Sequence, residues 1–170
     1  MINEKGNLYK KADAIVISTN GFVKTNGRCV MGKGCARQVR DNYTNSDLAL
    51  GDAIKANGNI CQIFGKDLDT NIDFIAYPVK PISVIFNGSN AVKHMLNRFE
   101  LGDSVPGWAA IADTELITQS AHQLVTLADK HKWNKVRLPR VGCGAGELNW
   151  LDIKAILDNI LDDRFIAVTF

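Results

Sequence analysis

Short runs of aliphatic and β-branched residues alternate along the chain with segments of helical periodicity. Residues 14–18 have the sequence AIVIS, an apolar run without a polar break, which is typical of a strand buried on both faces of a sheet. This strand is expected to end in a turn at residues 19–21. Similar runs predict further strands at residues 60–64, 72–77, 136–139 and 165–170. The polar segment between the first two of these indicates a hairpin turn.

Other segments carry the apolar spacing and the end signals of helices. They cover residues 35–43, 47–57, 113–131 and 150–161. The segment 113–131 is strongly amphipathic, because its apolar residues recur on one stripe. Strands that alternate with helices predict an α/β fold, layered around a largely parallel sheet.

The length of 170 residues predicts a single domain, 1–170, with one irregular segment. This segment, residues 82–107, contains the turn sequences NGS and VPG and has room for one short helix at 91–99. We expect it to be an insertion or a lid, because long irregular segments often have such roles. Trp108 follows it and could stack on a ligand, although packing in the core or at a rim is the simpler expectation.

Composition excludes several classes of protein. The formal net charge of +2 is too small to indicate a nucleic-acid or membrane partner by itself. The apolar runs are too short to span a bilayer, and the first residues lack the apolar core of a secretory signal. The four cysteines form no CxxC pair, and no histidine lies at metal-ligand spacing from them. We therefore expect reduced thiols, a cytoplasmic location, no metal site and no cofactor.

Two glycine-rich segments, residues 27–34 and 142–146, each come after a predicted buried strand. Glycine allows backbone N–H groups to approach a ligand closely, and open α/β sheets bind ligands at the carboxyl ends of their strands. The first segment also leads into a helix, whose N-terminus favours an anion. Together the two segments predict a ligand with more than one phosphate. The alternative, two ordinary turns between strands and helices, stays open.

Two common nucleotide-binding motifs are absent from these segments. Residues 27–33 match the start of a Walker A motif, but Gly34 stands where that motif has a Ser or Thr for magnesium. The Rossmann pattern GxGxxG also fails, because Glu147 stands where the third glycine would follow Gly142 and Gly144. A nucleoside triphosphatase and a dinucleotide-binding domain are therefore rejected.

Three blocks of the sequence resemble the signature blocks of the macro domain family. They are AIVISTN at residues 14–20, MGKGCA at 31–36 and LPRVGCGAGELNW at 138–150, in the order of that family. They are most similar to the branch with MGKG and PxxGCG loops. That branch includes terminal ADP-ribose glycohydrolases, antitoxins that remove ADP-ribose from DNA, and ADP-ribose-1″-phosphate phosphatases, and stand-alone phage and bacterial chains look similar. The resemblance implies a three-layer α/β/α sandwich with a mixed, largely parallel sheet and ADP-ribose across the strand ends.

The resemblance also implies which residues bind the ligand. The first loop would wrap the distal ribose and a phosphate, and the second would hold the pyrophosphate through backbone N–H groups. The residues of the two loops are Gly32, Lys33, Gly34 and Cys35, then Gly142, Cys143, Gly144, Ala145 and Gly146. Asn20 would orient the distal ribose. Asn7 stands where many members have an Asp that binds the adenine amino group, and its side-chain oxygen could still accept that hydrogen bond, without charge.

Asn20 and Lys80 are the candidate catalytic residues. The resemblance implies that Lys80, in the sequence PVK, lies at the distal ribose. There it could attack C1″ as an amine or stabilise developing negative charge as a cation. Gly146 stands where the protein-deacylating members carry an Asp as general base, whereas the DNA-directed members also have glycine. Glu147 could replace that Asp only if its side chain turned into the cleft.

Two hypotheses for the function follow from these residues. The first is a hydrolase acting at C1″ of ADP-ribose derivatives, either an ADP-ribose-1″-phosphate phosphatase or an ADP-ribosyl hydrolase. Its partner would be ADP-ribose, a derivative, or an ADP-ribosylated protein or DNA. The second is a module that binds ADP-ribose or a related nucleotide without turnover. Lys80 favours the enzyme, and Gly146 favours the binding module.

Overall fold

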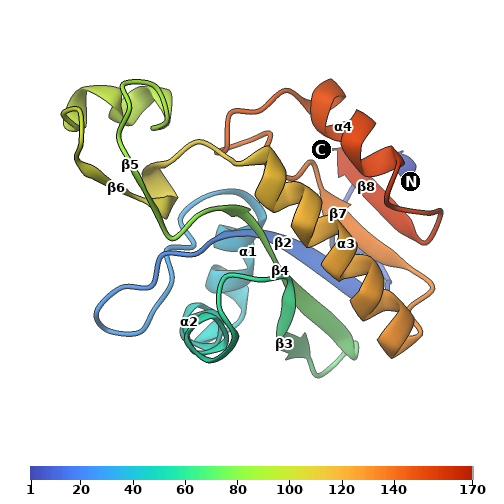
Figure 1. Ribbon diagram of the computed structural model, residues 1–170. Helices are drawn as coiled ribbons and strands as arrows, with labels where there is room; N and C mark the ends of the chain where they lie inside the picture. The colour runs from blue at the N-terminus through green and yellow to red at the C-terminus, as the bar shows by residue number, and fades with distance from the viewer. Residues whose placement is uncertain (170) are drawn as a thin grey trace.

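A six-stranded sheet forms the centre of the computed structural model, which describes residues 1–169 (Figure 1). The strand order is β1-β8-β7-β2-β4-β3. The strands are β1 (Ile2–Lys5), β2 (Ala14–Asn20), β3 (Gln62–Asp67), β4 (Ile72–Lys80), β7 (Val136–Pro139) and β8 (Phe165–Thr169). Neighbouring strands are parallel except for β3, which forms an antiparallel hairpin with β4. The predicted sheet, mixed and largely parallel, is confirmed.

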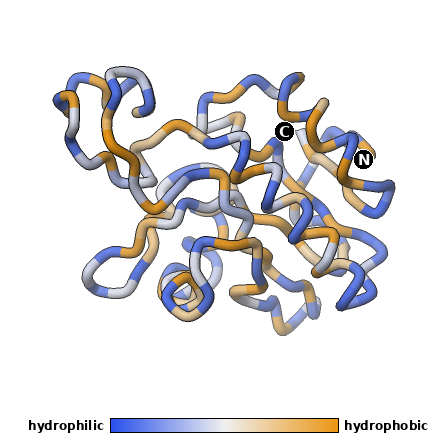
Figure 2. The backbone as a smooth tube through the Cα atoms, in the orientation of Figure 1, coloured by the Kyte–Doolittle hydropathy of each residue, from blue (hydrophilic) through white to orange (hydrophobic). Residues whose placement is uncertain are grey.

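Helices cover both faces of this sheet, which makes the predicted three-layer sandwich (Figure 1). They are α1 (Gly34–Asn42), α2 (Ser46–Asn57), α3 (Thr114–His131) and α4 (Trp150–Asp158). α1 and α2 pack on one face, and α3 and α4 pack on the other. Along α3 the hydropathy alternates between hydrophobic and hydrophilic with each turn, as its amphipathic pattern predicts (Figure 2). No helix within residues 1–169 is both long and apolar enough to cross a membrane.

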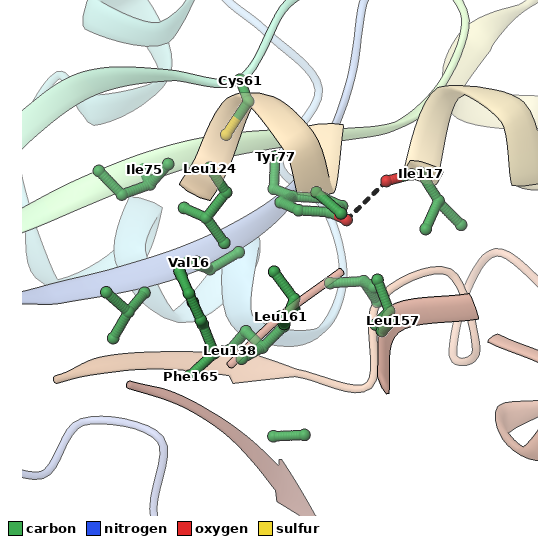
Figure 3. Packing of buried hydrophobic residues seen from close by; sticks show 14 of the residues in the cluster. Val16, Cys61, Ile75, Tyr77, Ile117, Leu124, Leu138, Leu157, Leu161 and Phe165 are labelled. Carbon is green, nitrogen blue, oxygen red and sulfur yellow. Dashed lines mark hydrogen bonds between the residues drawn. The ribbon is translucent and has the colours of Figure 1, made fainter. Parts of the chain in front are cut away.

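The unbroken apolar run of β2 serves two separate hydrophobic cores. Ala14 and Val16 pack in the core under α3 and α4, whereas Ile15 and Ile17 pack in the core over α1 and α2. Successive side chains of a strand point to opposite faces, so a central strand between two helical layers needs apolar residues at every position. In the first core the hydroxyl of Tyr77 donates to the carbonyl of Ile117 at 2.7 Å, which ties β4 to α3 (Figure 3).

Several predicted boundaries were wrong. β2 does not turn at residues 19–21 but continues to Asn20, where a register shift lets Asn20 pair with Lys80 of a β4 longer than predicted. β3 begins two residues and ends three residues later than predicted, and α4 ends at Asp158 rather than at residue 161. β1 was missed because it is a short edge strand with mostly exposed side chains. β8 is confirmed up to Thr169, and Phe170 lies outside the described residues.

The irregular segment predicted at 82–107 folds around a small core of its own. We call residues 82–112 the hairpin segment, because β5 (Ser83–Ile85) and β6 (Ser104–Pro106) pair antiparallel in it. It extends beyond the sheet in Figure 1. Its helices are both of the 3-10 type, η1 (Lys93–Arg98) and η2 (Gly107–Ala109), so the helix predicted at 91–99 is shorter and tighter than expected. The small core consists of Phe86, Ala91, Val105, Ala109 and Ala110.

Candidate functional site

A cleft of about 1020 Å³ opens at the carboxyl ends of the central strands. Because β8, β7, β2 and β4 are parallel neighbours, their last residues follow one another along the floor of this cleft. In that order the floor is made of Val168, Thr169, Pro139, Arg140, Ser18, Thr19, Asn20, Val79 and Lys80. The cleft therefore has one end at β8 and the other at Lys80 on β4.

Both glycine loops line this one cleft. The first loop leads into α1, whose N-cap residue Lys33 is extended and makes no side-chain capping bond. The first backbone N–H groups of α1 have no acceptor within the helix and lie beside the cleft, where a helix N-terminus favours an anion. All the loop residues named from the sequence, Gly32 to Cys35 and Gly142 to Gly146, are among the lining residues.

The second loop has no room for a side chain at Gly146. A Cβ atom there would lie 2.3 Å from the carbonyl oxygen of Gly142 and 2.7 Å from the Cβ of Ala112. Gly142 has a φ of +75°, which L side chains rarely adopt. Glycine at position 146 is thus a requirement of this loop conformation, because any larger residue would displace the backbone.

Lys80 is buried between the second loop and the hairpin segment, with 6% of its surface exposed. Its Nζ donates to the carbonyl of Ala145 at 2.7 Å and to that of Trp108 at 3.4 Å. Burial lowers the pKa of Lys80 from 10.5 to about 8, while the Glu147 carboxylate raises it and the Lys33 cation lowers it further. Lys80 is therefore a mostly charged but easily deprotonated amine in the wall of the cleft.

Asn20 lies beside Lys80 and also lines the cleft. Its Nδ2 donates to the carbonyl of Val30 at 3.0 Å, and its Oδ1 accepts from the backbone N–H of Phe22 at 3.1 Å. The side chain thus braces the segment that leads to the first glycine loop. One Nδ2 hydrogen and one Oδ1 lone pair remain for a ligand.

Asn7 does not line the cleft. It is exposed, and its Oδ1 accepts from the backbone N–H of Tyr9 at 2.9 Å. The turn that carries it lies next to the β8 end, because the N–H of Gly6 donates to the carbonyl of Thr169 at 2.8 Å. Of the residues proposed from the sequence, Asn7 is the one that the fold leaves outside the cleft.

A buried arginine stabilises this turn by binding its backbone carbonyls. Arg137 on β7 is 1% exposed and donates to the carbonyls of Leu8 at 3.2 Å and Asn7 at 3.0 Å. It also pairs with both carboxylate oxygens of Glu4. These bonds, with those from Lys10, lower the pKa of Glu4 from 4.5 to about 2. This role of Arg137 was not predicted, because an arginine within a strand run gives no signal of its partners.

Several further lining residues were not assigned from the sequence. Arg140 lies inside the PRVGCG block, and its guanidinium carbon is 5.4 Å from the ring centroid of Trp150. Its position just before the second loop could have identified Arg140 as a lining residue. His94 and Trp108 come from the hairpin segment, and Trp108, named from the sequence as a residue that could stack on a ligand, is 37% exposed and lines the cleft. These two residues reach the cleft only because the hairpin segment folds back toward the second loop, and the local sequence does not encode that contact.

The chemistry of the lining suits an anion. Lys33, Lys80 and Arg140 bring positive charge, whereas Glu147 is the one carboxylate that lines the cleft in the part of the chain described. Burial raises the pKa of the Cys35 and Cys143 thiols, the latter to about 11, so neither is a thiolate nucleophile at neutral pH. Within residues 1–169, no group of three or more His, Cys, Asp or Glu side chains could hold a metal ion.

No protein-family model and no curated protein matches the sequence. Solved structures do match the fold. The macrodomain of Mycobacterium tuberculosis DarG is 18% identical, with a TM-score of 0.68 over 99% of this chain and 98% of that one. Thermosipho africanus DarTG in complex with ADP-ribose is 16% identical, with a TM-score of 0.70 over 99% of this chain and 42% of that one. The Oceanobacillus iheyensis macrodomain with ADP is 14% identical, with a TM-score of 0.61 over 98% of this chain and 80% of that one. The chain therefore has the macrodomain fold.

Proposed function

We propose that the cleft binds ADP-ribose or a derivative of it, and that the protein hydrolyses the bond to the substituent at C1″. The observation that carries this proposal is that two glycine loops, Asn20 and Lys80 all line one cleft along the carboxyl ends of parallel strands. The fold it shares with structures that hold ADP-ribose or ADP supports the same ligand.

The diphosphate would bind between the two loops. Free N–H groups at the start of α1 and the backbone of the second loop offer hydrogen-bond donors, and Lys33 and Arg140 offer charge. The distal ribose would then lie at the Lys80 end, and the adenosine would extend toward the β8 end. A cleft of this volume is large enough for a dinucleotide-sized ligand.

Lys80 would act on the substituent at C1″ as an ammonium. Its pKa of about 8 keeps most of the amine protonated at neutral pH. Two of its N–H groups are directed to carbonyls, so one remains for the ligand. As the bond from C1″ to the leaving atom breaks, that atom keeps the electron pair and takes a proton from Nζ. A water adds to C1″ and loses a proton to solvent, and Asn20 and the loops fix the orientation.

A module that binds the nucleotide without turnover is the second candidate. The described residues that line the cleft support this candidate, because Gly146 has no room for a side chain and their one carboxylate, Glu147, is bonded to the backbone N–H of Lys93. Neither hypothesis requires a partner other than ADP-ribose or an ADP-ribosylated protein or DNA. The four free thiols support the cytoplasmic location that belongs to the same proposal.

Calorimetric titration tests the ligand, and product analysis tests the reaction. ADP-ribose should bind more tightly than AMP or ATP, and tighter binding of ATP would contradict the proposed ligand. The protein is then incubated with ADP-ribose-1″-phosphate, with ADP-ribosylated protein and with ADP-ribosylated DNA. Release of phosphate or of ADP-ribose supports the enzyme, whereas binding without any release supports the binding module.

A further inference from the structure

The helix η1 begins with a backbone donor that its own segment does not satisfy. The first N–H groups of a helix need an acceptor from outside it, and a Ser, Thr, Asp or Asn at the N-cap commonly provides one. The N-cap of η1 is Val92, which has no side-chain oxygen and makes no capping bond. The backbone N–H of Lys93 instead donates to Glu147, at 3.1 Å to Oε1 and 3.2 Å to Oε2.

This contact joins two walls of the cleft that are 54 residues apart in the sequence. Glu147 follows the second glycine loop and is held in the left-handed region, with a φ of 64°. On the other side, Val92 and His94, which flank Lys93, both line the cleft. A second bond joins the same walls, because the N–H of Ala112 donates to the carbonyl of Gly146 at 3.0 Å.

The joined walls meet at Lys80. Its Nζ donates to Ala145 in the second loop and to Trp108 in the hairpin segment. A shift of the hairpin segment away from the loop would therefore expose Lys80 and remove His94 and Trp108 from the cleft. Val92, His94 and Trp108 are the residues through which the hairpin segment lines the cleft.

We propose that Glu147 is a positioning residue, which caps η1 and thereby fixes the hairpin segment as the wall of the cleft next to Lys80. The inference deepens the proposed function and rests on it for the identity of the ligand. Glu147 acts here through an accepted hydrogen bond and not as a general base, since both of its oxygens face the Lys93 N–H. Its negative charge also raises the pKa of Lys80, which supports the ammonium form.

Amide hydrogen exchange in the ligand-free protein tests the contact itself. In Glu147→Ala the Lys93 amide should exchange about tenfold faster than in the wild type, because a hydrogen bond to a charged group is lost. Glu147→Gln keeps an acceptor oxygen and should retain most of the protection. Glu100→Ala, an exposed carboxylate of the hairpin segment outside the cleft, is the matched control. Unchanged exchange in Glu147→Ala would overturn the inference.

Affinities for ADP-ribose and ADP test the consequence. Glu147→Ala should weaken ADP-ribose binding about tenfold and leave ADP binding within about twofold, because only the distal ribose reaches the Lys80 end. Lys93→Pro should have the same effect, since proline removes the N–H yet is tolerated at the first position of a helix. The double variant should be no worse than either single one.

Three outcomes would overturn the inference. These are equal weakening of ADP and ADP-ribose, additive effects in the double variant, and a Glu147→Gln variant as impaired as Glu147→Ala. The last would indicate that the charge matters and not the hydrogen bond. If the wild type binds no ADP-ribose, the proposed function fails, and the exchange of the Lys93 amide still decides whether Glu147 positions the hairpin segment.

Discussion

The two ends of the cleft are built in opposite ways. At the β4 end, Lys80 is buried and held by carbonyls from two separate segments. At the β8 end, the nearby polar side chain of Asn7 is exposed and bonded within its own turn. The β4 end therefore presents a charged amine whose pKa is lowered by burial, whereas the β8 end presents a backbone turn held by hydrogen bonds. We infer that reactivity belongs to the Lys80 end and that the β8 end contributes shape and backbone contacts.

Each end also depends on a charged side chain from elsewhere in the chain, an exposed one at the Lys80 end and a buried one at the β8 end. Glu147 joins the walls at the Lys80 end through the Lys93 N–H. Arg137 holds the Asn7 turn at the β8 end through two carbonyls and Glu4. The comparison predicts that changes at the Lys80 end affect turnover, whereas changes at the β8 end affect stability or affinity.

Replacement of Lys80 is expected to have the largest effect. Lys80→Ala should lower kcat by about 10²–10³-fold, because it removes the charge that stabilises the leaving group. Binding of ADP should change little, since that ligand ends before the distal ribose. Lys130→Ala, an exposed lysine in the last turn of α3, is the control. Steady-state kinetics on the substrate that the wild type turns over measures the effect, and an unchanged kcat would remove Lys80 from the mechanism.

Loss of Arg137 is expected to be the next largest effect, and it should act on stability. Arg137→Met should lower the free energy of unfolding by about 2–3 kcal/mol, because buried carbonyls lose a charged donor. Denaturant unfolding measures the change. Arg164→Met, which loses exposed ion pairs with Asp129 and Asp162 and a cation–π contact with Phe165, should cost clearly less. Equal losses in the two variants would contradict a special role for the buried arginine.

The same arginine gives the protein a defined acid sensitivity. The folded-state pKa of Glu4 is about 2 and its usual value is 4.5, so this carboxylate contributes stability above pH 4.5 that is lost as the pH falls toward 2. The wild type should therefore lose more stability over this window than Arg137→Met, whose Glu4 has no arginine partner. Parallel slopes of unfolding free energy against pH in the two proteins would show that the Glu4–Arg137 pair does not contribute.

The pH dependence of turnover separates the two possible roles of Lys80. With a pKa of about 8 and an ammonium role, turnover should fall above pH 8, by about tenfold for each further pH unit. An amine that attacks C1″ would give the reverse, a rise through the same region. A pH profile of kcat/KM, which reports groups of the ligand-free protein, distinguishes them, with protein stability checked by circular dichroism at each pH.

Sequence patterns predicted the centre of this molecule well because that part obeys local rules. The unbroken apolar run of β2 reflects burial on both faces, and the glycines at 142 and 146 reflect a tight loop without room for side chains. Both features are properties of a few consecutive residues. For the same reason, the two glycine loops could be assigned to one ligand site from the sequence, whereas only the resemblance to the macro domain family implied a place for Lys80 beside them.

The contacts that complete the cleft were not predictable in this way. The bond between Glu147 and Lys93 spans 54 residues, and those between Arg137 and the turn at Asn7 span about 130. Such pairs depend on how the hairpin segment folds back and on which strands become neighbours in the sheet. The prediction of a turn at residues 19–21 was wrong for a similar reason, because the pairing of Asn20 with Lys80 extends β2 beyond its apolar run.

The smallest effect is expected at Asn7. Because its Oδ1 already accepts the Tyr9 N–H and carries no charge, Asn7→Ala should change the affinity for ADP-ribose by less than about threefold. For the same reason the wild type should discriminate only weakly between ADP-ribose and its inosine analogue, which lacks the adenine amino group. Titration of both ligands into both proteins measures these ratios. Strong discrimination that disappears in Asn7→Ala would mean that the side chain leaves its turn and binds the base, and the contrast between the two ends would then not hold.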